Sequence, residues 1–171
     1  MHGRYGHIVK LILFKNMRTE YIVGSNAFFT GMDGFSPKDN DRLILVDNTS
    51  ECGIPFKTHS ELRLKGNCYF FYKRLPKDEM IDNCINSKDP MVIGKFLVPT
   101  VIRDLKLTID DLKRLECVIP LLDDRHKYEE VIFYAYLKNN DFILTDQQRQ
   151  EAFDIYNKYR ISTIWFSIKK I

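Results

Sequence analysis

The sequence predicts an α+β protein, with a sheet-containing N-terminal half and a helical C-terminal half packed against it. Before Pro76, short β-rich runs alternate with turn residues, whereas after Pro76 the residues Leu, Ile, Lys and Asp recur at helical spacing. Hydrophobic residues make up 44% and charged residues 29% of the 171 residues, which excludes bulk disorder. We expect a single domain over 1–171, with a sheet-containing core at 1–75 and a mainly helical part at 76–171.

The N-terminal half is expected to hold four strands. They are predicted at 19–23, 42–46, 56–64 and 68–74. The run at 42–46 is nearly all apolar, which is typical of a strand buried on both faces. A helical period covers 5–15, where the β-branched residues leave a strand possible, and a short helix is predicted at 26–32. Lys65-Gly66-Asn67 has turn chemistry and connects the last two strands.

The C-terminal half predicts a series of helices. They are expected at 78–86, from 90 onward, at 108–115, at 124–138 and at 145–159. Capping patterns mark the starts at Thr108 and Thr145, and Pro99 is expected to break or kink the helix that begins at Pro90. The tail at 161–171 alternates loosely, which indicates a late edge strand.

Charge, hydropathy and cysteine spacing exclude several classes of protein. Lys plus Arg total 26 against 23 for Asp plus Glu, and the resulting charge of +3 is too small to indicate nucleic-acid binding by itself. No apolar run reaches the roughly 18 residues of a membrane span, and no signal peptide is recognisable. The four cysteines are 16, 16 and 33 residues apart, which fits neither a zinc site nor a disulfide framework. We therefore expect reduced thiols in a cytoplasmic (intracellular) protein with no membrane partner.

Three common nucleotide-binding or hydrolase patterns are absent from the sequence. The chain contains no Walker A pattern, no GxGxxG and no GxSxG. Their absence argues against a P-loop ATPase, a Rossmann dehydrogenase and an α/β-hydrolase.

One passage combines residues that suit phosphate chemistry. Gly24 follows a predicted strand and lets the backbone approach a phosphate without a Cβ, while Ser25 can donate its hydroxyl to a phosphate oxygen. The helix that follows offers free N–H groups to the same anion. Asp39 and Asp41 stand at the start of the next strand, and their spacing of two places both carboxylates on one face. Such a pair suits Mg²⁺, and two metal ions can activate an attacking hydroxyl and stabilise a leaving oxygen.

This order of residues resembles the signature of the nucleotidyltransferase-fold superfamily, which includes DNA polymerase beta and the minimal nucleotidyltransferases. The signature is a hydrophobic strand, Gly-Gly or Gly-Ser, a spacer, then Asp-x-Asp or Asp-x-Glu, with a third carboxylate on a later strand. Here thirteen residues separate Ser25 from Asp39, and the motif resemblance covers about 5–47. It implies a mixed sheet flanked by helices, Mg²⁺ as cofactor and an NTP as substrate.

The resemblance also implies roles for individual residues. Asp39 and Asp41 would be catalytic metal ligands, and Gly24 and Ser25 would bind the β- and γ-phosphates. Glu61 is the best candidate for the third carboxylate and the base. The implied reaction transfers a nucleoside monophosphate from the NTP to a hydroxyl of an unknown acceptor, which is a protein, an RNA or a small molecule.

Two departures from the signature leave alternatives open. Asn40 and Arg42 stand where the family prefers apolar residues, and the strand that begins at Cys68, which holds no acid, could be the true equivalent of the third-carboxylate strand. Lys73 and Arg74 beyond it could still contact a triphosphate. A catalytically inactive binding or regulatory module of the same fold is one alternative. A small α+β protein with no link to nucleotides is the other, and a sheet that separates Gly24 from Asp41 would favour it.

Overall fold

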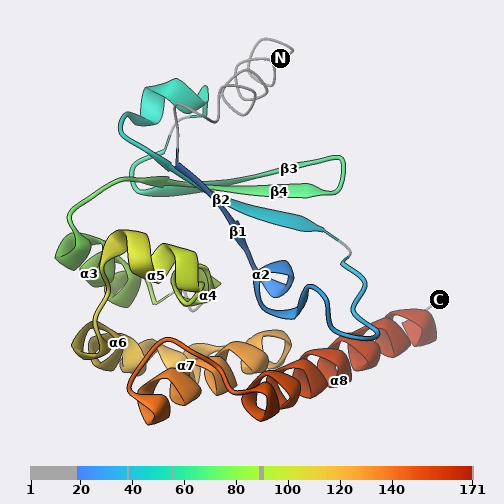
Figure 1. The fold of residues 1–171 in the computed structure, drawn as a ribbon. Helices are drawn as coiled ribbons and strands as arrows, with labels where there is room; N and C mark the ends of the chain where they lie inside the picture. Colours follow the sequence, from blue (N-terminus) through green and yellow to red (C-terminus); the bar gives the residue numbers. More distant parts are fainter. Residues whose placement is uncertain (1–18, 38, 55, 89–90, 171) are drawn as a thin grey trace. The chain divides into compact units, whose positions relative to one another are not determined.

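The computed structural model describes residues 19–37, 39–54, 56–88 and 91–170, and it is a mixed α+β structure with a four-stranded sheet (Figure 1). The predicted α+β class is therefore confirmed. The chain forms two compact units, Met1–Pro76 and Lys77–Ile171. The helix or strand predicted at 5–15 lies outside the described residues.

The first unit contains the mixed sheet. Its strands are β1 (Thr19–Val23), β2 (Asn40–Val46), β3 (His59–Leu64) and β4 (Asn67–Lys73). The order is β1-β2-β4-β3; β2 is antiparallel to β1 and parallel to β4, and β3 is antiparallel to β4. Lys65 and Gly66 connect β3 to β4 with φ values of 47° and 78°, the left-handed pair that a tight two-residue hairpin turn requires.

The sheet is covered by apolar side chains on both faces. The residues at 43–46 of β2 are all buried, as the continuous apolar run predicts. One face carries a cluster of Ile44, Val46 and Phe71, onto which Ile54, Phe56, Leu62 and Tyr69 pack. On the other side, α2 (Ser25–Phe29) packs against β1 and buries two phenylalanines. This helix is shorter than the predicted 26–32, because the amide of Met32 turns back to the Phe29 carbonyl and Gly31 adopts a φ of 90°.

The second unit is helical (Figure 1). Its elements are α3 (Lys77–Ser87), α4 (Met91–Phe96), α5 (Pro99–Leu105), α6 (Ile109–Leu115), η3 (Glu116–Leu121), η4 (Asp124–His126), α7 (Lys127–Asn139) and α8 (Asp146–Lys170). α4 ends at Phe96 and Pro99 is the first residue of α5, so the helical stretch is broken before Pro99, as expected, and is not kinked by it. The edge strand predicted at 161–171 is wrong, because α8 continues to Lys170. No Gly or Pro follows Tyr159, so nothing stops a helix that is already nucleated.

Asp111 fastens α6 to α3. Thr108 and Asp111 form the predicted capping box: the Asp111 amide donates to Thr108 Oγ1 at 3.2 Å, and the Thr108 amide donates to Asp111 Oδ2 at 2.9 Å. Lys77 Nζ lies 2.8 Å from the same carboxylate oxygen. Nearby, Arg114 bridges Asp78 at 3.0 Å and Asp82 at 2.6 Å. The start of α6 and the exposed side of α3 are thus held by paired charges.

Asp111→Asn should weaken the acid dependence of stability. Burial raises the pKa of the Asp111 carboxyl, but the hydrogen bonds from Lys77 and Thr108 outweigh burial and leave this pKa below its ordinary value of 3.8. A carboxyl with a lowered folded pKa stabilises the fold above its unfolded pKa, and the contribution is lost as pH falls through the folded pKa. The variant should be about 1 kcal/mol less stable near neutral pH and lose less stability below about pH 4.

Urea unfolding followed by circular dichroism at a series of pH values measures this effect. Asp110→Asn, an exposed carboxyl on the same turn, is the matched control. An acid dependence of Asp111→Asn equal to that of the wild-type chain would contradict the role given to the carboxylate.

Candidate functional site

Gly24 and Asp41 lie against each other at one end of the sheet. Val23, the last residue of β1, pairs with Asp41 on β2. Gly24 follows with φ 73° and ψ −159°, a conformation that is essentially restricted to glycine. A Cβ at Gly24 would collide with Asp41 Oδ2. The separation of Gly24 from Asp41 that would favour a protein without nucleotide chemistry is therefore not found.

Asn26 holds the start of β2 in place. Its Nδ2 donates to the Asp39 carbonyl at 3.1 Å and to Asn40 Oδ1 at 3.2 Å. Its Oδ1 is buried and has no hydrogen-bond partner in the described part of the chain. Asp39 itself is exposed just before β2, and Ser25 is the half-buried first residue of α2. Because α2 has only five residues, Ser25 stands on a single turn and not on the dipole of a long helix.

Cys68 occupies the position beside Asp41 on the neighbouring strand. β4 is parallel to β2, and Cys68 pairs with Asp41. The thiol is buried, and Sγ donates to Glu61 Oε1 at 3.3 Å. Burial first, and then this bond and the negative charges of Glu61 and Asp41, raise the pKa of the thiol to about 12. The strand next to Asp41 therefore carries an uncharged thiol and no carboxylate.

Glu61 lies one strand further away, on β3. It pairs with Phe70, while Arg63 pairs with Cys68. Arg63 Nε donates to Glu61 Oε1 at 3.0 Å, so this oxygen accepts from both Arg63 and Cys68. Within the ranges that the structure describes, no group of three or more His, Cys, Asp or Glu side chains is placed to hold a metal ion. Glu61 is therefore not found in a preformed cluster with Asp39 and Asp41 in the described part of the chain.

Lys73 and Arg74 do not belong to this end of the sheet. Lys73 pairs with Val46 at the far end of β2 from Asp41. Arg74 is engaged with Asp47 at 3.4 Å and with Thr19 Oγ1 at 2.6 Å. Among the described residues, Arg63 is a basic side chain near Asp39 and Asp41, and no sequence motif pointed to it. Its position two residues after Glu61 on the same strand places it on the same face.

The residues present fit a magnesium ion. Mg²⁺ in phosphate-handling sites is usually held by one or two carboxylates and by the phosphates of the substrate, not by an all-protein cage. Asp39 and Asp41 supply hard oxygen ligands, and the Asp41 carboxylate packs directly against the backbone of Gly24, in the space that a side chain would otherwise fill. The unpaired Oδ1 of Asn26 adds an acceptor beside Asp39. A two-carboxylate site completed by phosphate oxygens is compatible with this arrangement.

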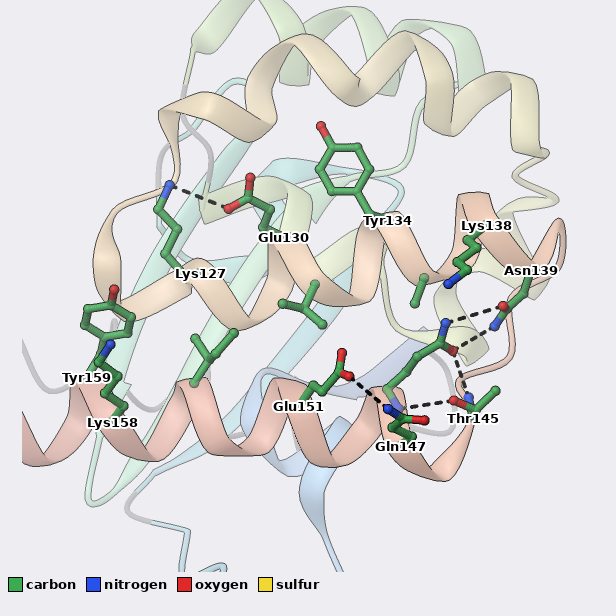
Figure 2. A pocket seen from close by; sticks show the side chains of 14 residues that line it. Lys127, Glu130, Tyr134, Lys138, Asn139, Thr145, Gln147, Glu151, Lys158 and Tyr159 are labelled. Carbon is green, nitrogen blue, oxygen red and sulfur yellow. Dashed lines mark hydrogen bonds and ion pairs between the residues drawn. The ribbon is translucent and has the colours of Figure 1, made fainter.

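The helical unit contains a groove of about 840 Å³ between α7 and α8 (Figure 2). The polar side chains at one end of the groove bond to one another: Asn139 Nδ2 donates to Gln148 Oε1 at 2.8 Å, and the Gln148 backbone amide donates to Thr145 Oγ1 at 3.1 Å. Lys127 and Glu130 form an ion pair of 3.7 Å along the rim. With lysines and glutamates mixed around it, the groove selects no ligand chemistry.

Comparisons of the chain with protein-family models, with curated proteins and with solved structures found no match. Within the described ranges, none of the helices has the length and apolar character needed to cross a lipid bilayer.

Proposed function

We propose that the chain binds an NTP with Mg²⁺ at the sheet end formed by Gly24, Ser25, Asp39 and Asp41, and transfers a nucleoside monophosphate to a hydroxyl of an acceptor. The contact between Gly24 and Asp41 supports this best, because it brings a backbone segment without a Cβ next to a carboxylate. A phosphate that approaches Gly24 would lie beside a metal held by Asp41. The two segments come from different parts of the chain, and the pairing of Val23 with Asp41 brings them together.

Each side chain has a defined task in the proposed site. Asp39 and Asp41 hold the metal, which when bound polarises the phosphate and offsets its negative charge. Gly24 permits the approach of the phosphates, and Ser25 Oγ donates to a phosphate oxygen. Asn26 fixes the backbone of Asp39 through its hydrogen bond of 3.1 Å. Glu61, to which the resemblance gives the part of third ligand and base, has one oxygen already engaged by Arg63 and Cys68 and is not needed as a ligand in this two-carboxylate site.

A second candidate function is nucleotide binding without transfer. The observation that favours it is Cys68, because a soft thiol stands beside Asp41 on the neighbouring strand, where a hard carboxylate would be needed to share a magnesium ion. Two ligands suffice to bind a magnesium–nucleotide complex, whereas holding a second metal needs more carboxylates. The chain would then act as a regulatory module that binds an NTP without reacting with it.

Replacing both aspartates, Asp39→Asn with Asp41→Asn, should abolish magnesium-dependent nucleotide binding. A ligand that binds only the folded state at about 100 times its Kd stabilises it by about 2.7 kcal/mol. A panel of NTPs with and without Mg²⁺ should therefore raise the melting temperature of the wild-type chain and leave the double variant unmoved. Asp33→Asn, an exposed carboxyl in the same loop, is the control and should behave as wild type. No magnesium-dependent shift of the wild-type chain with any NTP would overturn the proposal.

Pyrophosphate release, with water as a slow acceptor, separates the two candidate functions. A transferase releases pyrophosphate from the bound NTP, and a binding module does not. Cys68→Asp adds a carboxylate beside Asp41 and should create or raise this release in a chain that already binds Mg²⁺ and NTP. Binding without release in both proteins would favour the regulatory module.

A further inference from the structure

A row of three side chains runs across the sheet from Asp41 to Arg63. Asp41 pairs with Cys68, and Cys68 pairs with Arg63, so all three point to the same face. Neighbouring strands are about 4.8 Å apart, which separates the backbones of Asp41 and Arg63 by about 10 Å. The residue between them is an uncharged thiol. The row is therefore acidic at one end, neutral in the middle and basic at the other end.

The guanidinium of Arg63 has donors to spare. Its Nε is used by Glu61, and no bond from its two terminal nitrogens to another described residue is found. The side chain is 72% exposed. The hydrogen bond to Glu61 is the largest cause of the raised pKa of Arg63, and the negative charges of Glu61 and Asp39 add to it, so Asp39 lies within electrostatic range of the guanidinium. A guanidinium with free paired donors is the side chain that best matches a phosphate.

We propose that Arg63 binds the phosphates of the nucleotide from the side opposite the carboxylate pair, and that Glu61 positions Arg63. This inference rests on the proposed function and assigns to the same site its phosphate-binding cation. The backbones of Asp41 and Arg63 are about 10 Å apart and their side chains rise from the same face, so phosphates held beside Asp41 would come within reach of the long Arg63 side chain. Cys68 lies between them, with its thiol buried and donating to Glu61.

The role of Glu61 follows from its contacts. It holds Arg63 through Nε, which is the nitrogen at the base of the guanidinium, and so leaves the terminal nitrogens directed away from Glu61. A carboxylate that acts in this way changes nucleotide affinity through Arg63. A carboxylate that binds the metal directly would change the affinity for Mg²⁺ itself.

Calorimetric titration with MgATP, with tripolyphosphate plus Mg²⁺, and with Mg²⁺ alone tests the assignment. Arg63→Gln should weaken binding of MgATP and of tripolyphosphate by about 10- to 100-fold, and Arg63→Lys should recover part of the loss. Neither variant should weaken binding of Mg²⁺ alone. Arg42→Gln is the matched control, because Arg42 follows Asp41 on β2 but points to the other face, where it lies 3.9 Å from Glu20.

The variants of Glu61 separate its two possible roles. Glu61→Gln should weaken MgATP binding less than Arg63→Gln does, and the double variant should bind no worse than Arg63→Gln alone. Loss of binding of Mg²⁺ alone in Glu61→Gln would overturn the positioning role. If the wild-type chain and Arg63→Gln bind MgATP equally well, the role of Arg63 is overturned while the proposed function stands. If the wild-type chain does not bind MgATP, both the role of Arg63 and the proposed function are overturned.

Discussion

Gly94→Ala should lower the free energy of unfolding by about 2 kcal/mol, although alanine is the better helix former. Gly94 lies in α4, and a Cβ there would collide with the carboxylate of Glu129 on α7. Glu129 is only 4% exposed, and its Oε1 lies 2.9 Å from His126 Nδ1. The buried carboxylate has no solvent to move into, so relief of the collision disturbs either this contact or the packing of α4.

Thermal unfolding followed by circular dichroism measures this loss, which corresponds to a fall in melting temperature of about 4–8 °C. In a chain that already carries Glu129→Ala, the carboxylate is gone. Adding Gly94→Ala to that chain should therefore cost much less stability than Gly94→Ala costs in the wild-type chain. Thr100→Ala, an exposed position of α5, should change stability by less than about 0.5 kcal/mol. A higher melting temperature for Gly94→Ala would contradict the contact between α4 and α7.

Gly24→Ala is expected to damage both stability and the candidate site. The backbone conformation at Gly24 is strained by about 1–3 kcal/mol for any residue with a Cβ, and the collision with Asp41 Oδ2 lowers the stability of the variant further. The new methyl group would displace the Asp41 carboxylate, so magnesium-dependent nucleotide binding should be lost even where the chain stays folded. Urea unfolding and nucleotide titration of the same sample measure the two effects.

Gly34→Ala separates backbone strain from the contact with Asp41. Gly34 also has a positive φ, of 84°, but no atom lies within 4 Å of a Cβ built there. It should lose stability through strain alone and keep its nucleotide binding. Equal binding by Gly24→Ala and Gly34→Ala would show that the contact with Asp41 has no part in the site.

Local patterns predicted the elements well where short-range physics decides them. The apolar run at 42–46 predicted a buried strand, and the Thr108 and Thr145 capping boxes predicted two helix starts, because caps and periodicity act within one turn or one strand. The tail after Tyr159 was misassigned, since a loose alternation also fits a helix that simply continues. The end of α2 depended on Gly31, whose positive φ only the fold reveals.

The site was predictable only in part, because its geometry depends on which strands become neighbours. The hairpin of β3 and β4 follows from its turn residues, but the parallel pairing of β4 with β2 joins segments that are distant in the chain. That pairing places Cys68, and not Glu61, beside Asp41. Together with the β3–β4 hairpin it also brings Arg63 near Asp41, whereas Lys73 and Arg74, which the strand order was expected to leave within reach of a triphosphate, lie toward the other end of β2.

The strand order also gives the candidate site a gradient of local stability. β2 is hydrogen-bonded on both sides, whereas β3 lies at an edge of the sheet in the part of the chain that the structure describes. Edge segments open at lower free energy than central strands in native-state hydrogen exchange. Fraying of β3 would carry away Arg63 and Glu61 together and leave Gly24 and Asp41 joined. In the proposed site, an anion held by Arg63 would then leave through the opening of one strand, while the proposed metal ligand Asp41 stays in place.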